Sequence, residues 1–236
     1  LSLHDALPIS ATAMEHVADG FATLKIKITR GMDAALSLAA VRRAVGADVL
    51  LRIDANQAWS ESESIRQIRA CEDAGLALDL VEQPVAARDL DALAAVTAAV
   101  DTPVMADESV RTAHDVRLIA ERGAAQLVNI KLAKTGGLAE ARRAAATARE
   151  AGLGVVVGCM MEGHVGVAAA AHLAAAIAPD VVHDLDAALW LRRPPVHGGI
   201  RYIRDAIELG EGPGLGVSGL LEDADAVSTV ASGANG

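Results

Sequence analysis

The sequence predicts an α/β fold in which parallel strands and helices alternate around a closed barrel. Short β-branched or apolar runs alternate with Ala-rich stretches whose charged residues recur at helical spacing. Seven such runs joined by helices require parallel pairing with right-handed crossovers. An open doubly wound sheet shares this alternation, but no Gly-x-Gly-x-x-Gly follows the first strand. Polar residues instead collect at the carboxyl end of nearly every strand, which favours the barrel.

The composition suits such a fold and narrows the classes of function. Hydrophobic residues make up 52% of the 236 residues but aromatic residues only 2%, so Ala, Val, Leu and Ile must fill the core. A formal charge of −10 argues against nucleic acid or an anionic membrane as partner. Cys71 and Cys159 lie far apart in no metal-like spacing, which fits a protein of the reducing cytoplasm. The richest apolar run, residues 165–178, is too short to span a bilayer.

The individual elements follow from these runs and from local start and stop signals. Ser60 with Glu63 gives a capping-box pattern, and Gly75, Gly123 and Gly152 stand where glycines end helices. The strands are expected at residues 23–28, 49–53, 78–81, 104–106, 127–130, 154–157 and 181–183. The helices are expected near residues 11–20, 33–46, 61–74, 88–99, 112–122, 137–151 and 165–177.

The chain is expected to divide into three parts. Residues 1–10 have neither the basic start nor the apolar stretch of a signal peptide, and they look like a non-native leader. Residues 11–192 form the barrel domain. Residues 193–236, rich in Pro and Gly, form a C-terminal extension that packs outside the barrel, with its last dozen residues disordered.

Two lysines alternate with isoleucines in the first strand. Period-two alternation in Leu24-Lys25-Ile26-Lys27-Ile28 places Lys25 and Lys27 on one face of the strand. In a barrel this face points into the lumen, where two cations are costly unless acids lie opposite. The alternative is an exposed edge strand with solvated lysines, and the strand alone does not decide between them.

Three acids end the next three strands. Asp54, Glu82 and Asp107 occupy equivalent places at the carboxyl ends of consecutive strands. Three converging carboxylates suit a hard divalent cation such as Mg²⁺, with positions left for water or substrate. The alternative is that each acid caps the helix that follows it.

A third lysine, Lys131, ends the fifth strand and is expected at the barrel mouth, opposite Lys27. Two bases on opposite sides of one carbon can remove a proton from one face and return it to the other. A proton beside a carboxylate is very weakly acidic, so a cation must stabilise the charge that its removal creates. Lys25 and the cation both favour the neutral amine at Lys27, as a base requires.

These motifs together resemble the enolase superfamily, in its muconate-lactonising-enzyme branch. The resemblance implies a modified TIM-type (β/α)7β barrel, with Lys27 and Lys131 as the acid/base pair and one Mg²⁺ bound by Asp54, Glu82 and Asp107. Lys25 and Asn56 are expected to contact the substrate. The motifs that carry the resemblance are Lys25-Ile26-Lys27, Asp54-Ala55-Asn56, Glu82-Gln83-Pro84, Asp107-Glu108-Ser109 and Lys131-Leu132-Ala133-Lys134-Thr135-Gly136-Gly137.

Acids near the last strand indicate the substrate class. Asp184 and Asp186 share a face if the strand persists that far, and the resemblance to dipeptide epimerases implies that they hold the substrate's ammonium group. Muconate cycloisomerases and o-succinylbenzoate synthases, with anionic substrates, gain nothing from this pair. The alternative is that both acids cap a following turn. Glu162 is expected to line the mouth or to support another residue there.

The sequence therefore predicts a Mg²⁺-dependent dipeptide epimerase that acts on a small-molecule substrate, with association into homo-oligomers left open. Cycloisomerisation, dehydration as in an o-succinylbenzoate synthase, and N-acylamino-acid racemisation are alternatives that keep the same metal and lysines. The resemblance also implies an N-terminal α+β capping domain and a first barrel strand, for which we find no counterpart in this chain. The barrel is accordingly expected to be incomplete at its first strand, and a truncated, non-catalytic fragment is the remaining alternative.

Overall fold

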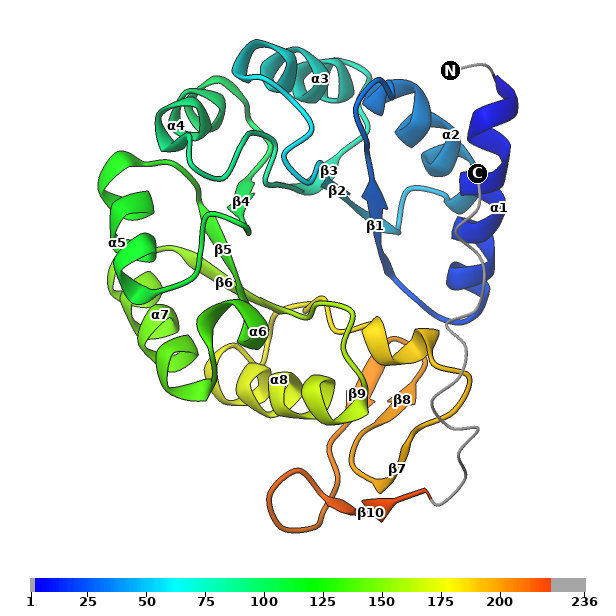
Figure 1. Cartoon of the computed structure of the whole chain (residues 1–236). Helices are drawn as coiled ribbons and strands as arrows, with labels where there is room; N and C mark the ends of the chain where they lie inside the picture. The colour runs from blue at the N-terminus through cyan, green and yellow to red at the C-terminus, as the bar shows by residue number, and fades with distance from the viewer. Residues whose placement is uncertain (1–2, 222–236) are drawn as a thin grey trace.

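A curved sheet of six parallel strands forms the centre of the molecule (Figure 1). The computed structural model describes residues 3–221, with side chains from residue 9 onward. The strands lie side by side in chain order, each parallel to the next, as the predicted barrel requires. They are β1 (Thr23–Lys27), β2 (Leu50–Asp54), β3 (Leu78–Glu82), β4 (Val104–Ala106), β5 (Leu127–Lys131) and β6 (Gly154–Gly158).

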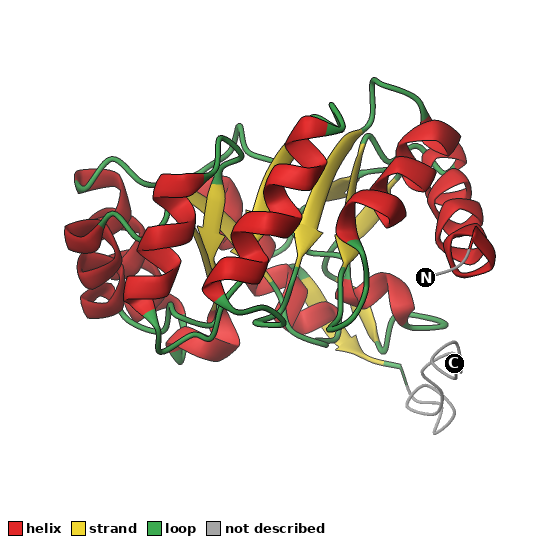
Figure 2. Ribbon diagram, turned by 90° about the horizontal axis from the view of Figure 1, so that it is seen from above, coloured by secondary structure: helices red, strands yellow, loops and turns green. Residues whose placement is uncertain are grey.

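Helices cover the outer face of this sheet (Figure 2). Each predicted helix is present, and a four-residue helix that the sequence did not predict directly follows β5. Residues 3–10, set apart above as a leader, run in one helix with residues 11–18. The helices are α1 (Leu3–Ala18), α2 (Ala34–Val45), α3 (Glu61–Asp73), α4 (Leu90–Ala99), α5 (Ala113–Arg122), α6 (Leu132–Thr135), α7 (Leu138–Glu150), α8 (His164–Ile177) and the 3₁₀ helix η1 (Ala187–Trp190).

Local signals begin and end these helices much as predicted. The hydroxyl of Ser60 accepts a hydrogen bond from the backbone N–H of Glu63 at 3.3 Å, which caps α3. A capping box with both of its hydrogen bonds is found at α5 instead, between Thr112 and Asp115. Gly123 ends α5 in the left-handed conformation, with a φ of 60° that glycine adopts without a steric penalty.

The core consists of small and β-branched side chains, as the scarcity of aromatic residues predicts. In β1 the side chains of Leu24 and Ile26 are buried toward the helices, so those of Lys25 and Lys27 face the interior of the ring. Cys71 and Cys159 are both free and buried, and burial is the main cause that raises their thiol pKa values to about 12 and about 11. Within residues 3–221, no helix is long and apolar enough to cross a membrane.

The prediction of a seventh strand is wrong, because residues 181–183 form no strand. The chain touches the sheet there through a single parallel bridge between Gly158 and Asp184. The C-terminal extension then forms two short antiparallel pairs, which lie outside the ring in Figure 1. The expected disorder of the last dozen residues falls outside the described part of the chain. The two pairs are β7 (Val196–Gly198) with β10 (Val217–Leu220), and β8 (Arg201–Ile203) with β9 (Ala206–Glu208).

Candidate functional site

Strand register brings the predicted lysine and acids into one row. Lys27 lies opposite Asp54 in the β1–β2 pairing, and Asp54 lies opposite Glu82 in the β2–β3 pairing. Glu82 is in turn opposite Met105, two residues before Asp107. Because neighbouring strands are about 4.8 Å apart, consecutive members of the row are within reach of one shared ligand. We call Asp54, Glu82 and Asp107 the acid row.

Glu82, at the middle of the acid row, is fully buried between two donors. Lys25 Nζ donates to Glu82 Oε2 at 3.0 Å, and Asn129 Nδ2 donates to Glu82 Oε1 at 2.7 Å. Burial raises the pKa of Glu82 to about 7, Lys25 works against this rise, and Asp54 and Asp107 add to it. The raised pKa therefore reflects burial first, and the neighbouring carboxylates second.

Lys25 joins the acid row to the predicted ammonium-binding acid. Its Nζ lies 3.6 Å from Asp54 Oδ2 and also forms an ion pair with Asp184. Burial lowers the pKa of Lys25, but Glu82, Asp184 and Asp54 together outweigh burial and raise it. The reading of a solvated edge lysine is therefore wrong for Lys25. It fits Lys27 better, whose side chain is 70% exposed and lies 3.6 Å from Asp54 Oδ2.

Asp107, at the other end of the acid row, is held by two lysines. Lys131 Nζ donates to Asp107 Oδ2 at 2.9 Å, while Lys134 binds both the carboxylate and the main-chain carbonyl of Asp107. Burial opposes ionisation of Asp107, but the two ammonium groups outweigh burial and lower its pKa. Burial likewise lowers the pKa of Lys131, yet Asp107 outweighs it and raises that pKa. For Lys134 burial prevails and its pKa is lowered.

The chain contains four lysines, and all four lie in this cluster. The other seventeen basic residues are arginines. A guanidinium stays protonated in proteins, whereas an amine can lose and regain a proton. Lysine is thus confined to the one region where buried carboxylates gather.

The structure adds residues that the sequence analysis did not single out. Asn129 holds Glu82 and stands two residues before Lys131, so period-two alternation in β5 could have identified it. Lys134 was inside a quoted motif without a role. Asn129 and Lys131 depend on Gly158 of β6, where an added Cβ would stand 2.5 Å from Asn129 Oδ1 and 2.9 Å from Lys131 Cε.

A third addition, Gln83, ties the end of β3 to the loop after β4. Its fully buried Oε1 accepts hydrogen bonds from the backbone N–H groups of Asp107 and Ser109 at 2.9 and 3.2 Å. On the outer side of the row, Asn56 Nδ2 donates to Glu108 Oε1 at 2.7 Å. Asn56 also donates its backbone N–H to Asp54 Oδ1 at 3.0 Å. The acid row is thus fixed by amides as well as by lysines.

The residues proposed to select the substrate are arranged differently from the prediction. The backbone is no longer a strand after Asp184, and Asp186 begins η1 without a side-chain cap, so alternation along a strand does not relate the two acids. The pKa of Asp186 is raised, first by desolvation of its carboxyl group and then by the charge of Asp184. Glu162 Oε1 accepts from the backbone N–H of Met160 at 2.9 Å, within its own loop.

The acids of the row already have lysines as counter-ions. Among residues 3–221, no three His, Cys, Asp or Glu side chains stand together in a way that could hold a metal ion. The donor chemistry nevertheless suits Mg²⁺, because Asp54, Glu82 and Asp107 are buried carboxylates and Glu82 has a raised pKa. A cation at this place would meet three carboxylates that lysines now pair with, so it would have to take over part of that pairing.

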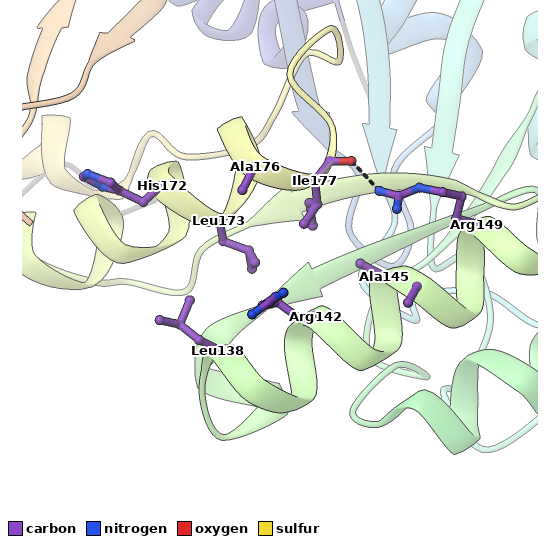
Figure 3. Close-up of a pocket in the computed structure, with 9 residues that line it drawn as sticks. Leu138, Arg142, Ala145, Arg149, His172, Leu173, Ala176 and Ile177 are labelled. Carbon is purple, nitrogen blue, oxygen red and sulfur yellow. Dashed lines mark hydrogen bonds between the residues drawn. The ribbon is translucent and has the colours of Figure 1, made fainter. Parts of the chain in front are cut away.

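A groove of about 500 Å³ lies on the outer layer, between α7 and α8 (Figure 3). Arg149 closes one end by donating to the carbonyl of Ile177 at 2.9 Å. None of the predicted site residues lines it. The groove is therefore separate from the candidate site at the carboxyl ends of the strands.

Comparison with known proteins identifies relatives over most of the chain. The family described as "Enolase C-terminal domain-like" matches residues 9–224. A hydrophobic dipeptide epimerase of Enterococcus faecalis is 42% identical over 221 residues, covering 92% of this chain and 62% of the relative. An L-Ala-D/L-Glu epimerase of Bacillus subtilis is 42% identical over 222 residues, covering 93% of this chain and 60% of the relative. The chain thus spans about three fifths of the length of these curated relatives.

Solved structures show the same arrangement of elements. A substrate-liganded complex of the L-Ala-D/L-Glu epimerase from Bacillus subtilis superposes with a TM-score of 0.89 at 41% identity, covering 92% of this chain and 61% of that one. The dipeptide epimerase from Enterococcus faecalis complexed with Mg and the dipeptide L-Leu-L-Tyr gives a TM-score of 0.83 at 40% identity, covering 90% and 60%. The half-closed ring of six strands is therefore the barrel seen in these proteins.

Proposed function

Because the chain belongs to the enolase C-terminal domain-like family, we propose that it is the barrel of a dipeptide epimerase, which inverts a dipeptide at an α-carbon. Two relatives at 42% identity are a hydrophobic dipeptide epimerase and an L-Ala-D/L-Glu epimerase. This likeness supports the reaction class. The chemistry must come from the residues of the site itself.

The observation that carries the proposal is the confinement of every lysine to the acid row. Lys27 pairs with Asp54 at one end of the row, and Lys131 pairs with Asp107 at the other. A substrate carboxylate held over the row would have one amine on each side. That arrangement is what inversion by two bases requires, and a chain that otherwise uses only arginine supplies amines only here.

The two lysines lie in different surroundings. Lys131 is buried against Asp107, which raises its pKa and keeps it protonated, ready to give a proton to one face of the substrate. Lys27 is exposed at the open side of the row and would take the proton from the other face. In the reverse reaction the roles exchange. Lys27, which has taken up a proton, then gives it back, and Lys131, which has lost one, takes a proton from the substrate.

Asp54, Glu82 and Asp107 would hold the Mg²⁺ ion. When bound, the ion supplies positive charge against the negative charge that develops on the substrate carboxylate as its α-proton leaves. Asn129 and Gln83 keep Glu82 and the loop of Asp107 in place for this task. Lys25 now forms ion pairs with Asp54, Glu82 and Asp184. Once a cation binds the acids of the row, Lys25 would be free to bind the substrate carboxylate.

Asp184 and Asp186 would bind the substrate's ammonium group. Two carboxylates close to the row, one of them paired with Lys25, form a negative region that suits a free amino terminus. Asn56 and Glu162 would contribute further polar contacts at the mouth. An N-acylated amino acid has no α-ammonium group for these acids to bind, which separates the proposal from racemisation of N-acylamino acids with neutral side chains.

The test is exchange of α-protons in a small dipeptide library, followed by NMR in D₂O with Mg²⁺ present. Deuterium should enter one α-carbon with loss of its chirality, and removal of Mg²⁺ by a chelator should stop the exchange. N-acylamino acids and muconate lactone precursors are assayed in parallel. Turnover of these compounds, with none of any dipeptide, would assign the chain to another reaction of the family.

A further inference from the structure

The segment that carries Asp184 and Asp186 is attached to the sheet by a single bridge and not by a strand. We call residues 182–186 the acid segment. Two backbone hydrogen bonds join it to the sheet, from Asp184 N–H to the carbonyl of Val157 and from Cys159 N–H to the carbonyl of Asp184, both 3.0 Å. A third, from Leu189 N–H to the carbonyl of Asp186 at 2.9 Å, belongs to η1. A strand in the sheet would continue this ladder, so something else must orient the residues on either side of Asp184.

Two side chains hold the first half of the acid segment. Arg52 of β2 reaches across the ring and donates to the carbonyl of Val182 at 2.9 Å, and Asp79 orients it through a 2.6 Å ion pair. His183 accepts from the backbone N–H of Val157 at 3.0 Å through Nδ1. Its Nε2 must then carry the proton that is shared with the carbonyl of Ala178 at 2.9 Å.

One side chain from outside the barrel holds the second half. Tyr202, in β8 of the C-terminal extension, donates its hydroxyl to the carbonyl of Leu185 at 2.6 Å. This carbonyl belongs to the peptide that joins Leu185 to Asp186, so its direction sets the direction in which Asp186 leaves the bridge. The ring of Tyr202 packs against the main core, and burial is the main cause of its raised pKa, which keeps the hydroxyl protonated as a donor.

We infer that Tyr202 is a positioning residue that sets the spacing of Asp184 and Asp186 and thereby the recognition of a substrate ammonium group. The inference rests on the proposed function for the identity of that group. Leu185 is buried, so its carbonyl would lack a partner without the hydroxyl, and the peptide would turn toward another donor. Asp184 would keep its bridge, although the bridge would open more often, while Asp186 moved. The C-terminal extension would thus take part in selecting the substrate.

The test compares Tyr202→Phe with a matched control in the full chain. Thr97→Val removes a hydroxyl that donates to the carbonyl of Ala124 at 2.8 Å, in the helical layer and not at the site. The probes are L-Ala-L-Glu and its N-acetyl derivative, assayed with Mg²⁺. Tyr202→Phe should raise KM for the free dipeptide roughly fivefold, the worth of one hydrogen bond, with kcat unchanged. The inhibition constant of the N-acetyl derivative should not change, and Thr97→Val should change neither.

A second readout does not depend on activity. In Tyr202→Phe, hydrogen exchange at the amides of Asp184 and Cys159 should accelerate roughly fivefold, while the amide of Val81 in β3 stays unchanged. Unchanged amides, or an equal loss of affinity for both probes, would overturn the inference. If Tyr202→Phe accelerates exchange but the wild type inverts no dipeptide, the proposed function fails, and with it the role of Tyr202 in substrate recognition. The conclusion that Tyr202 holds the acid segment would then still stand.

Discussion

The acid row and the acid segment lie at the same end of the barrel, but they are held in different ways. The row ends strands whose register aligns Lys27 with Asp54 and Asp54 with Glu82. The acid segment has one isolated bridge and relies on Arg52, His183 and Tyr202. One region is fixed by a repeating backbone pattern, and the other by single side chains from distant parts of the chain.

This difference separates two tasks in the proposed reaction. Metal binding and proton transfer depend on residues that regular strand pairing brings together. Recognition of the ammonium group depends on a segment that a change in a remote residue could reorient. We therefore expect substitutions in the row to remove activity, and substitutions around the segment to alter the choice of substrate.

The largest effect is expected for the two bases. Lys27→Ala or Lys131→Ala should each lower epimerisation about 10³-fold, because general acid–base catalysis contributes roughly 10²- to 10⁴-fold. The measurement is inversion of the α-carbon, followed by chiral chromatography. Retained inversion in either variant would refute the two-base mechanism.

The control for this prediction is Lys131→Arg. The guanidinium preserves the charge beside Asp107 but stays protonated, so the ion pair survives while proton transfer is lost. Its thermal unfolding should remain close to that of the wild type. If Lys131→Arg inverts substrate at the normal rate, Lys131 has only a structural role.

The next effect concerns the acid segment. Asp184→Asn and Asp186→Asn should each raise KM for a free dipeptide by about 30- to 100-fold, the worth of a charge-assisted hydrogen bond, with less change in kcat. Asp205→Asn, in the turn between β8 and β9, is the matched control. Equal losses for a free dipeptide and its N-acetyl form would show that the acids do not select the ammonium group.

Much of the acid row was predictable from sequence, because its placement follows from rules that act locally. Alternation in β1 predicted that Lys25 and Lys27 share a face, and the burial of Leu24 and Ile26 confirms it. Parallel pairing predicted that Asp54, Glu82 and Asp107 gather at one edge. The barrel and the relationship to dipeptide epimerases were predicted from the same motifs and are confirmed. The catalytic roles remain predictions.

The acid segment was not predictable in the same way. An apolar pair before His183 suggested a strand, yet Arg52 and His183 replace strand pairing with side-chain hydrogen bonds. Tyr202 gave no signal, since its partner is a carbonyl and any residue supplies one. A hydrogen bond from a side chain to a distant backbone carbonyl produces no regular residue spacing that could be recognised in the sequence. Strand pairing does, because side chains alternate between the two faces of each strand.

A smaller effect should come from the amide that supports the row. Asn129→Leu removes the donor to Glu82 Oε1 without changing charge, and should weaken Mg²⁺ binding about tenfold in calorimetric titration. Gln126→Leu is the matched control, because Gln126 accepts from the backbone N–H of Val104 at the opposite end of the strands. Unchanged Mg²⁺ affinity in Asn129→Leu would show that lysines alone orient Glu82.

The smallest effect is the pH dependence of stability that His183 causes. Burial, and after it the charge of Arg52, lower the folded pKa of His183 below its ordinary value of 6.5. Nδ1 must also stay unprotonated to accept from the backbone N–H of Val157. The unfolded chain therefore binds the proton more readily, and stability present above about pH 6.5 is lost as the pH falls below it.

Between about pH 7.5 and pH 5.5, the wild type should lose on the order of 1 kcal/mol more unfolding free energy than His183→Gln, measured by urea titration. Other titrating groups, His164 among them, are common to both proteins and cancel in this comparison. Equal losses would show that the segment keeps its place without the neutral imidazole. The acid row is aligned by the register of its strands, so the Mg²⁺ affinity of His183→Gln should stay at the wild-type value. A loss of Mg²⁺ affinity in this variant would mean that the acid row and the acid segment are not independent.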